Sequence, residues 1–444
     1  MEDATRRDAQ GGDPGAQYAL SQIEFKRGNK REALSWLEKS VAHGFSDACY
    51  SMAMFQIAGI SVPFDAVGAR RNLRTAADQG HADAGLILSQ LVRSGFGGSK
   101  SGESANALLV ELAERGHPMA LCGVAMLLHV RGQLEGAVEI FLERAALKGS
   151  HVAAYIRAEM RRDAMASGDL RARDERIKYL FLSARAGNRL AEAELTENEK
   201  SVVRGILDRA SFSPTADSDV IFEDVAEALN QPFEHVPDRP EILSSECNIL
   251  KFRNFLTPVE CSYIKAAAAP GIQPSSTVHP HTGELIKNEI RTSSSSNFDP
   301  VSRDHFIFSV DERIAAATDT IVEQGEPLNV LYYRIAEEYK FHYDFLSANN
   351  EEERRLLKEG GQRKFTFLIS LNEEYSGGET YFPRLDVKYR GQLGDALMFQ
   401  NTGVDGQPNE LMLHAGMPIT CGQKWVASKW IREEAFTLGA PARM

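Results

Sequence analysis

Residues 339–345 read Tyr-Lys-Phe-His-Tyr-Asp-Phe and contain a His-x-Asp pair, His342 and Asp344, that follows a strand-like run. Alternate residues of an extended segment project to the same side, so these two side chains point together. A third candidate, His414, lies in another apolar run much further along the chain, and Lys424 follows it. Two histidines and one carboxylate can hold Fe(II) and leave positions open for O₂ and a co-substrate. The pattern predicts an iron centre with a lysine for the far carboxylate of a 2-oxoacid.

A His-x-Asp pair carries little weight alone, because the chain contains another at His81–Asp83. Asp83 holds the same repeat position as Asp47, so this second pair belongs to a repeated turn and is assigned no metal. His279 and His281 flank a proline in a Pro/Ser-rich loop with no third ligand, and we interpret them as surface residues. An ordinary buried or surface histidine is the alternative for each histidine of the predicted iron site taken singly.

The C-terminal half around the predicted iron site consists of short strand-like runs separated by Gly, Asn and Asp turns. These runs cover residues 249–255, 328–335, 365–371, 396–399 and 425–431. One helix is predicted at 258–268, with Thr257 as its N-cap, and another at 310–324. Late strands preceded by a few helices predict a β-sandwich or jelly roll with helical support.

The N-terminal part of the chain repeats a different pattern. Five copies of Gly-x-x-x-Ala recur, and their glycines are Gly44, Gly80, Gly116, Gly149 and Gly187. A leucine stands seven residues before each glycine, and small or apolar residues stand three and four before it, so these positions share one helical face. The glycine predicts a left-handed turn that ends this helix, and the alanine predicts close packing at the start of the next helix.

Such a unit cannot bury its apolar face alone, so the copies are predicted to stack into an α-solenoid with a concave binding surface. The repeats resemble Sel-one-like repeats, relatives of the tetratricopeptide repeat, over residues 17–198. A Gly/Ser-rich insert at 94–104 interrupts the third copy and is predicted to be mobile. Residues 1–16 are predicted to be disordered, and residues 199–245 to form a linker with one helix at 220–230.

Length, composition and charge limit the class of protein. With 444 residues, 43% of them hydrophobic and 25% charged, the chain is long enough for two or three soluble domains. A net charge of −12 argues against nucleic-acid and anionic-membrane partners, which need a basic face. Five scattered cysteines without a CxxC pair are typical of reduced thiols. No secretory signal is visible, and the most apolar stretch, 119–130, is too short to cross a bilayer, so we expect a cytoplasmic protein.

Further motifs connect the His-x-Asp pair to the lysine in a fixed order. They are Leu371-Asn372, Gly377-Gly-Glu-Thr-Tyr-Phe-Pro383, Gly394-Asp-Ala-Leu-Met-Phe399, His414-Ala-Gly-Met-Pro418 and Gly422-Gln-Lys-Trp425. Together with residues 339–345, these motifs resemble the prolyl 4-hydroxylase family of 2-oxoglutarate- and Fe(II)-dependent dioxygenases, over roughly residues 247–435.

The resemblance implies a double-stranded β-helix, or jelly roll, over residues 246–438. It implies His342, Asp344 and His414 as the iron ligands at the catalytic centre, and Lys424 as the partner of the C5 carboxylate of 2-oxoglutarate. The implied cofactors are Fe(II), 2-oxoglutarate and O₂, with ascorbate as the reductant.

Four more residues match positions of the same family. Tyr333 and Thr366 match positions that line the 2-oxoglutarate pocket. Arg291 and Ser293 resemble an Arg-x-Ser segment that meets the peptide substrate in relatives. The alternative for this last segment is a flexible polar loop, because it overlaps the polar run Thr292–Ser296.

Two departures from the family are visible, and the first leaves the identity of the substrate open. Arg334-Ile-Ala-Glu-Glu338 is bulky and acidic where collagen-type relatives carry a Gly-rich stretch, and Ser370 stands where an aromatic residue is common. Three hypotheses remain open. The chain is a protein or peptide hydroxylase, most simply prolyl, whose solenoid recruits the substrate. It is an oxygenase for another side chain or a small molecule, whose solenoid serves assembly. Or it is a non-catalytic repeat adaptor.

Overall fold

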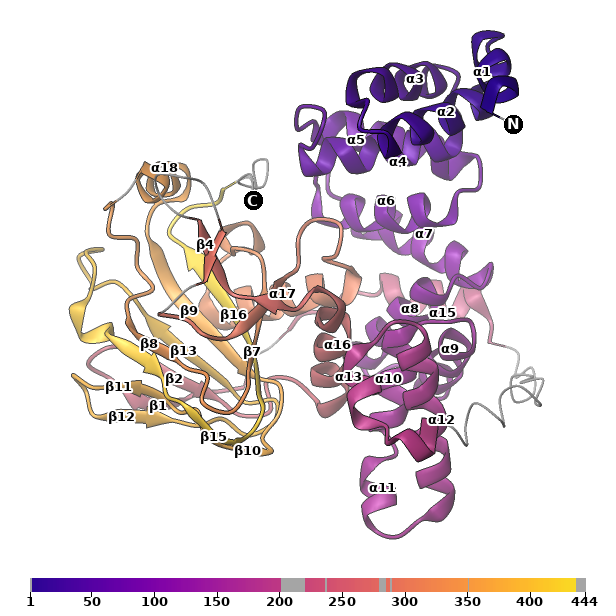
Figure 1. Ribbon diagram of the computed structural model, residues 1–444. Helices are drawn as coiled ribbons and strands as arrows, with labels where there is room; N and C mark the ends of the chain where they lie inside the picture. Colours follow the sequence, from indigo (N-terminus) through magenta and orange to yellow (C-terminus); the bar gives the residue numbers. More distant parts are fainter. Residues whose placement is uncertain are drawn as a thin grey trace.

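The computed structural model describes residues 2–200, 220–235, 238–278, 285–287, 290–349 and 351–436 (Figure 1). A helical array forms one side of the molecule, and a β-sandwich with attached helices forms the other. None of the described helices is long and apolar enough to cross a membrane. The predicted surface residues His279 and His281 lie outside the described residues, as does most of the predicted linker's first half.

The α-solenoid consists of antiparallel helices that stack side by side. Its members are α1 (Glu2–Gln10), α2 (Pro14–Lys26), α3 (Lys30–Ala42), α4 (Ser46–Ala58), α5 (Ala66–Asp78), α6 (Ala82–Ser94), α7 (Gly102–Glu114), α8 (Pro118–Arg131), α9 (Glu135–Leu147), α10 (His151–Glu159), α11 (Arg162–Ala166), α12 (Leu170–Arg185) and α13 (Arg189–Glu194). Helix α15 (Phe222–Asn230) packs against α7 and α8, at the position predicted for a linker helix.

The repeated Gly-x-x-x-Ala segments fold as predicted. All five glycines lie in the left-handed region, with φ between 73° and 101°, which L side chains adopt only with strain. All five alanines are fully buried at the start of the next helix, and the leucines seven residues before the glycines are buried too. Glycine turns and small-residue packing therefore set the spacing of the solenoid.

Two predictions about the solenoid need correction. Residues 2–16 form α1 and the start of α2 instead of a disordered segment, and the Asp13 carboxylate accepts a hydrogen bond from Ala16 there (2.6 Å). Arg6 of α1 also pairs with the buried Glu24 at 2.8 Å. The insert at 94–104 forms a defined connection, and its Lys100 reaches Glu323 in the C-terminal region (3.3 Å).

Two antiparallel sheets form the C-terminal region, and the predicted jelly roll is confirmed. The larger sheet has the order β1-β2-β13-β9-β16-β7-β6-β3, and the smaller one has the order β12-β11-β14-β8. Strand pairs β10–β15 and β4–β5 complete the region. The strands are β1 (Glu241–Ser244), β2 (Ile249–Phe252), β3 (Gln273–Pro274), β4 (Ser276–Val278), β5 (Leu285–Lys287), β6 (Ser294–Asn297), β7 (Asn329–Tyr333), β8 (Tyr339–His342), β9 (Arg363–Ser370), β10 (Tyr375–Gly377), β11 (Thr380–Phe382), β12 (Val387–Tyr389), β13 (Ala396–Gln400), β14 (His414–Gly416), β15 (Ile419–Gly422) and β16 (Lys424–Arg432).

The predicted strand-like runs correspond to β2, β7, β9, β13 and β16. The predicted helix at 258–268 is α16 (Pro258–Ala268), and Thr257 forms a capping box with Glu260. Of the run 292–296, whose alternative prediction is a flexible loop, Ser294–Ser296 lie in β6 between β3 and β7, and Thr292 and Ser293 precede the strand. A further helix, α18 (Glu351–Gly360), lies at the edge of this region.

The helix predicted at 310–324 begins earlier and ends earlier than expected. Helix α17 covers His305–Thr318, because the Asp304 carboxylate accepts hydrogen bonds from the backbone N–H groups of Phe306 and Ile307. Asp319 then ends the helix in the left-handed region, and a short 3₁₀ turn follows at Val322–Gln324.

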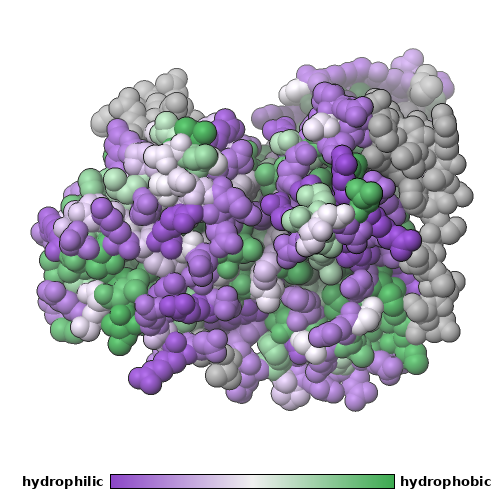
Figure 2. Space-filling view, turned by 90° about the horizontal axis from the view of Figure 1, so that it is seen from below, coloured by the Kyte–Doolittle hydropathy of each residue, from purple (hydrophilic) through white to green (hydrophobic). Residues whose placement is uncertain are grey.

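Helices α16 and α17 lie between the larger sheet and the solenoid (Figure 1). Their apolar side chains belong to one continuous core that extends from the larger sheet into α8 and α10. Polar contacts cross the same boundary: His305 Nε2 lies 2.9 Å from Ser89 Oγ, and Arg93 pairs with Glu312 at 3.6 Å. The chain's own helices therefore cover the side of α6, α8 and α10 that faces the larger sheet, which is called the inner face of the solenoid below. Seen from below, hydrophilic residues cover most of both regions and hydrophobic residues gather in patches (Figure 2).

A charge placed in this boundary is expected to uncouple the two regions. Val152 of α10 is buried beside Tyr263 and Ala267 of α16, so Val152→Asp would bury an unpaired carboxylate at a cost of about 3 kcal/mol. We expect calorimetry to show one cooperative transition for the wild type and two for Val152→Asp. Val67→Asp, at a position that is 66% exposed, is the control and should melt once. A single unshifted transition in Val152→Asp would contradict the shared core.

Candidate active site

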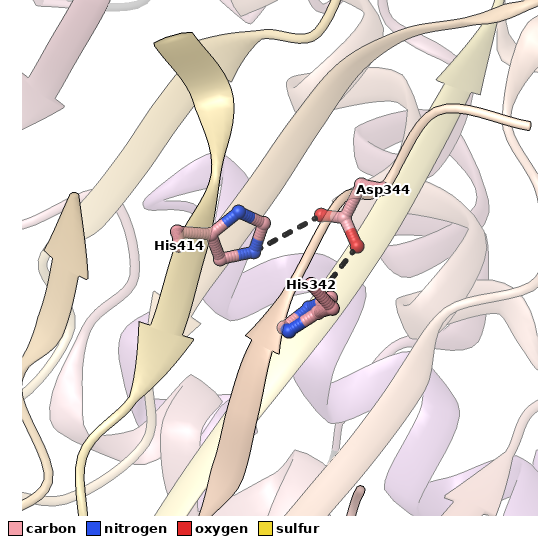
Figure 3. Close-up of side chains that lie close together, drawn as sticks. All are labelled: His342, Asp344 and His414. Carbon is pink, nitrogen blue, oxygen red and sulfur yellow. Dashed lines mark ion pairs between the residues drawn. The ribbon is translucent and has the colours of Figure 1, made fainter. Parts of the chain in front are cut away.

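Three predicted ligands come together between the two sheets. His342 ends β8 and His414 begins β14, and the antiparallel pairing sets these two residues directly opposite each other. Asp344 follows β8 and points between the two rings (Figure 3). Its Oδ1 lies 3.5 Å from His342 Nε2, and its Oδ2 lies 3.6 Å from His414 Nε2. Each residue offers one ligand atom, and these atoms lie within 4.8 Å of one another.

Backbone carbonyls fix the orientation of both imidazole rings. His342 Nδ1 donates to Lys340 O (2.7 Å), and His414 Nδ1 donates to Met412 O (2.9 Å). A carbonyl can only accept, so in the neutral ring Nδ1 carries the proton and Nε2 keeps its lone pair for a metal. Both Nε2 atoms face the Asp344 carboxylate.

The protonation states at neutral pH favour a divalent cation. Burial and the neighbouring His342 lower the pKa of His414 to about 4, so this ring is neutral. Burial alone would raise the pKa of Asp344, but His414, His342 and a hydrogen bond from Thr366 hold it well below its usual range. A buried carboxylate faced by the Nε2 atoms of two imidazole rings is a donor set that fits Fe(II).

No other described residues form a comparable cluster: this is the one group of three or more His, Cys, Asp or Glu side chains there whose ligand atoms lie close enough for a metal. The second His-x-Asp pair has another role in the structure. His81 Nδ1 caps α6 by accepting from the backbone N–H of Ala84 (3.2 Å). Asp83 instead faces His117 at 3.2 Å.

Lys424 lies at the other end of the same pocket. It starts β16 opposite Tyr333 of β7, is 9% exposed, and its Nζ donates to Gly378 O at 2.7 Å. Burial lowers the pKa of Lys424 to about 8, although Glu379 acts in the opposite direction. Within the described ranges, no carboxylate lies at ion-pair distance from this ammonium. A buried cation without an anionic partner fits the carboxylate of a ligand.

The other predicted site residues surround the pocket in different ways. Tyr333 is buried under Lys424, whose Nζ lies 5.6 Å from the ring centroid. Arg291 lines the pocket, and its guanidinium lies 5.6 Å from the Tyr339 ring. Ser293 is buried and hydrogen-bonds to the Tyr333 hydroxyl. Thr366, predicted to line the 2-oxoglutarate pocket, is not among the lining residues; it is buried next to Asp344, and its hydroxyl donates to Asp344 Oδ2 (2.7 Å).

Several pocket residues were missed by the sequence reasoning. Asn329, Ser428 and Trp430 line the pocket, and among the described residues Asn329 Oδ1 and Trp430 Nε1 have no hydrogen-bond partner. Alternate residues of a strand face the same side, and this rule would have identified all three. Residues 329, 331 and 333 share one face of β7, and residues 424, 426, 428 and 430 share one face of β16.

Comparison with known proteins gives the family. The 2OG-Fe(II) oxygenase superfamily matches residues 328–432. "Prolyl 4-hydroxylase 1" of Arabidopsis thaliana is 36% identical over 211 residues, which cover 44% of this chain and 73% of the plant protein. The chain belongs to the prolyl 4-hydroxylase family of 2OG-Fe(II) oxygenases. As a member of this family it is an enzyme of the 2-oxoglutarate oxygenase class, and the adaptor hypothesis loses its support.

Solved structures resemble each half of this oxygenase. The viral collagen prolyl hydroxylase of Paramecium Bursaria Chlorella virus-1, in its 2OG complex, is 25% identical, covers 41% of this chain and 95% of its own, and has a TM-score of 0.32. A Sel1 repeat protein from Oxalobacter formigenes is 24% identical, covers 27% of this chain and 95% of its own, and has a TM-score of 0.26. The two folds themselves are established by the helices and strands described above.

The environment of Lys424 predicts a measurable cost of burying its charge. Because its folded pKa of about 8 lies below the ordinary 10.5, Lys424→Met should stabilise the ligand-free protein by about 1–3 kcal/mol at pH 7. Lys424 binds its proton more weakly in the folded state than in the unfolded state. The gain in unfolding free energy from Lys424→Met is therefore complete below pH 8 and disappears as the pH rises from 8 to 10.5. Urea unfolding at several pH values measures it.

A second buried lysine on the same strand is the matched control. Lys429 is buried like Lys424 but pairs with Asp311. Lys429→Met should therefore destabilise the protein, by about 1–3 kcal/mol, because Asp311 loses one of its two cationic partners and keeps only Arg303. Destabilisation of equal size in both variants would contradict the unpaired state of Lys424.

Proposed function

We propose that this oxygenase hydroxylates a proline residue of a polypeptide, using Fe(II) held by His342, Asp344 and His414 and 2-oxoglutarate anchored by Lys424. The observation that carries the proposal is one pocket with the three ligand groups at one end and an unpaired buried ammonium at the other. The 36% identity to a plant prolyl 4-hydroxylase supports proline as the target.

The residues of the pocket have separate tasks in this reaction. Bound Fe(II) and 2-oxoglutarate supply the chemistry, in which O₂ converts an unactivated C–H bond to C–OH while 2-oxoglutarate becomes succinate and CO₂. Lys424 binds the far carboxylate by a charge-assisted hydrogen bond, which a buried site strengthens. Leu331, Val426 and Leu368 line the pocket with apolar side chains and exclude water from it.

Two residues that line the pocket are candidates for contact with the substrate. Arg291 and Tyr339 lie at the pocket, and an isolated β-bridge joins their backbones. We assign Arg291 to substrate contact, and Ser293 to support of Tyr333, because Ser293 is buried behind that ring. Ascorbate is assigned as the reductant that keeps the iron in its active ferrous state.

Hydroxylation of another side chain is the second candidate function. It is favoured by the turn Arg334–Glu338 next to the pocket, where Ile335 is 61% exposed and Ala336 occupies the left-handed region (φ 67°). A turn that accepts this strain in alanine presents bulkier and more acidic side chains than a glycine-rich turn would. The side chains of this turn lie next to the pocket, so they can favour a substrate other than the one that collagen-type relatives bind.

The solenoid is assigned to recruitment of the substrate or a partner, but along a shorter surface than the sequence suggests. Helices α16 and α17 cover the inner face of α6, α8 and α10. Binding by the inner face is therefore assigned to α2 and α4. We place the domain boundary within residues 199–245, with the repeat domain beginning at residue 2 instead of residue 17.

Succinate formation from 2-oxoglutarate tests the proposed function. Purified protein with Fe(II), ascorbate and O₂ should form succinate faster when Pro-containing peptides are added, and mass spectrometry should find +16 on proline. His342→Ala and His414→Ala should reduce turnover by at least a hundredfold, because each removes a metal ligand.

The second His-x-Asp pair provides the matched control for this assay. His81→Ala should leave turnover unchanged, since His81 caps a solenoid helix. Equal loss in His81→Ala would sink the assignment of the metal site. Turnover that is unchanged by Pro-containing peptides but disappears in His414→Ala would keep the oxygenase and point to another substrate.

A further inference from the structure

Asp344 is the one ligand of the three that no strand holds in place. His342 and His414 belong to β8 and β14, and each ring donates to a carbonyl two residues earlier in the chain. Asp344 lies in a bend beyond the end of β8. Its backbone carbonyl accepts a long hydrogen bond from Arg363 (3.4 Å), which leaves the direction of the carboxylate to be set by other groups.

Two buried side chains from neighbouring strands set that direction. Thr366 of β9 donates its hydroxyl proton to Asp344 Oδ2 at 2.7 Å, and Asn401 Nδ2 donates to Thr366 Oγ1 at 2.9 Å. A hydroxyl group has one proton to give. Because the amide of Asn401 donates to the hydroxyl oxygen, the hydroxyl proton is left to point at the carboxylate.

Asn401 is itself held rigidly beside Thr366. It follows β13, whose Phe399 pairs with Thr366 across the sheet. The backbone N–H of Asn401 donates to Lys364 O (2.8 Å), and its carbonyl accepts from Asn409 (2.9 Å). The two hydrogen bonds from Asn401 to Thr366 and from Thr366 to Asp344 are called the relay below. It begins at the fixed backbone of Asn401 and ends at the Asp344 carboxylate.

The burial of Asn401 points to a task beyond packing. The residue is 0% exposed, and among the described residues its side-chain Oδ1 has no hydrogen-bond partner. An unpaired buried amide oxygen is unfavourable, and an apolar side chain of similar size would avoid that cost. An apolar side chain would not donate the hydrogen bond that the Asn401 amide gives to Thr366 Oγ1.

We propose that Asn401 and Thr366 are positioning residues that orient the Asp344 carboxylate for binding Fe(II). The proposal rests on the proposed function, since it assumes that Asp344 is an iron ligand. Neither residue is placed at the reacting atoms, so their effect should appear first in metal affinity.

The test compares Fe(II) affinity, measured anaerobically by competition with a chelator and without 2-oxoglutarate, in a small set of variants. Thr366→Val keeps the shape and removes the hydroxyl, and Thr366→Ser keeps the hydroxyl. Asn401→Leu removes the amide, and the double variant Thr366→Val/Asn401→Leu asks whether the two act in series. Ser370→Ala, at a buried hydroxyl four residues further along the same face of β9, is the control.

We expect Thr366→Val to weaken Fe(II) binding by tenfold to a hundredfold, as removal of a group that orients a metal ligand generally does. Thr366→Ser and Ser370→Ala should stay within threefold of the wild type. Asn401→Leu should weaken binding about tenfold without lowering the melting temperature, and the double variant should be no weaker than Thr366→Val alone. The ligand-field spectrum of the Co(II)-loaded protein should change in Thr366→Val and remain unchanged in Ser370→Ala.

Three results would overturn the inference. Unchanged Fe(II) affinity in a folded Thr366→Val protein would overturn the relay and leave the metal site intact. Multiplied losses in the double variant would show two independent effects instead of a relay. A wild-type protein that binds no Fe(II) at all would overturn the proposed function, and the relay with it.

Discussion

The antiparallel register between β8 and β14 is the constraint on which the rest of the site depends. It sets His342 opposite His414, and directly opposite residues hold their Cβ atoms about 5 Å apart, close enough for two rings to share an ion. A slip of one residue would turn one histidine to the other face of the sheet. The start of β8 is held by Lys340, whose backbone N–H donates to Ile290 O, and by the bridge between Tyr339 and Arg291. Arg291, which lines the pocket, therefore also helps to hold the start of β8.

Strand β16 connects this site to the rest of the molecule. On its inner face, Lys424, Val426 and Ser428 line the pocket. On its outer face, Trp425 and Ala427 belong to the core that continues through α16 and α17 into the solenoid. The repeat domain is thus part of the support of the catalytic domain, and its inner face is only partly left for a partner.

The sequence predicted those features that are local or periodic. Gly-x-x-x-Ala spacing located the solenoid, and the His-x-Asp spacing identified two groups of the cluster, although Asp344 lies in a bend beyond β8 and not in the strand. The long-range features could not be predicted. The contact of Asn401 with Thr366 depends on the pairing of β13 with β9, which no local pattern encodes. The prediction begins α17 at residue 310, five residues too late. The true N-cap, Asp304, precedes an unusually apolar first turn. The covering of the solenoid by α16 and α17 depends on contacts between regions more than a hundred residues apart.

The most direct test of the account is a crystal structure of the protein grown anaerobically with Mn(II), a redox-stable substitute for Fe(II), and 2-oxoglutarate. The account predicts one metal ion bound by His342 Nε2, His414 Nε2 and the Asp344 carboxylate, with the far carboxylate of 2-oxoglutarate on Lys424 Nζ. A metal ion at any other group, or a 2-oxoglutarate whose far carboxylate avoids Lys424, would contradict it.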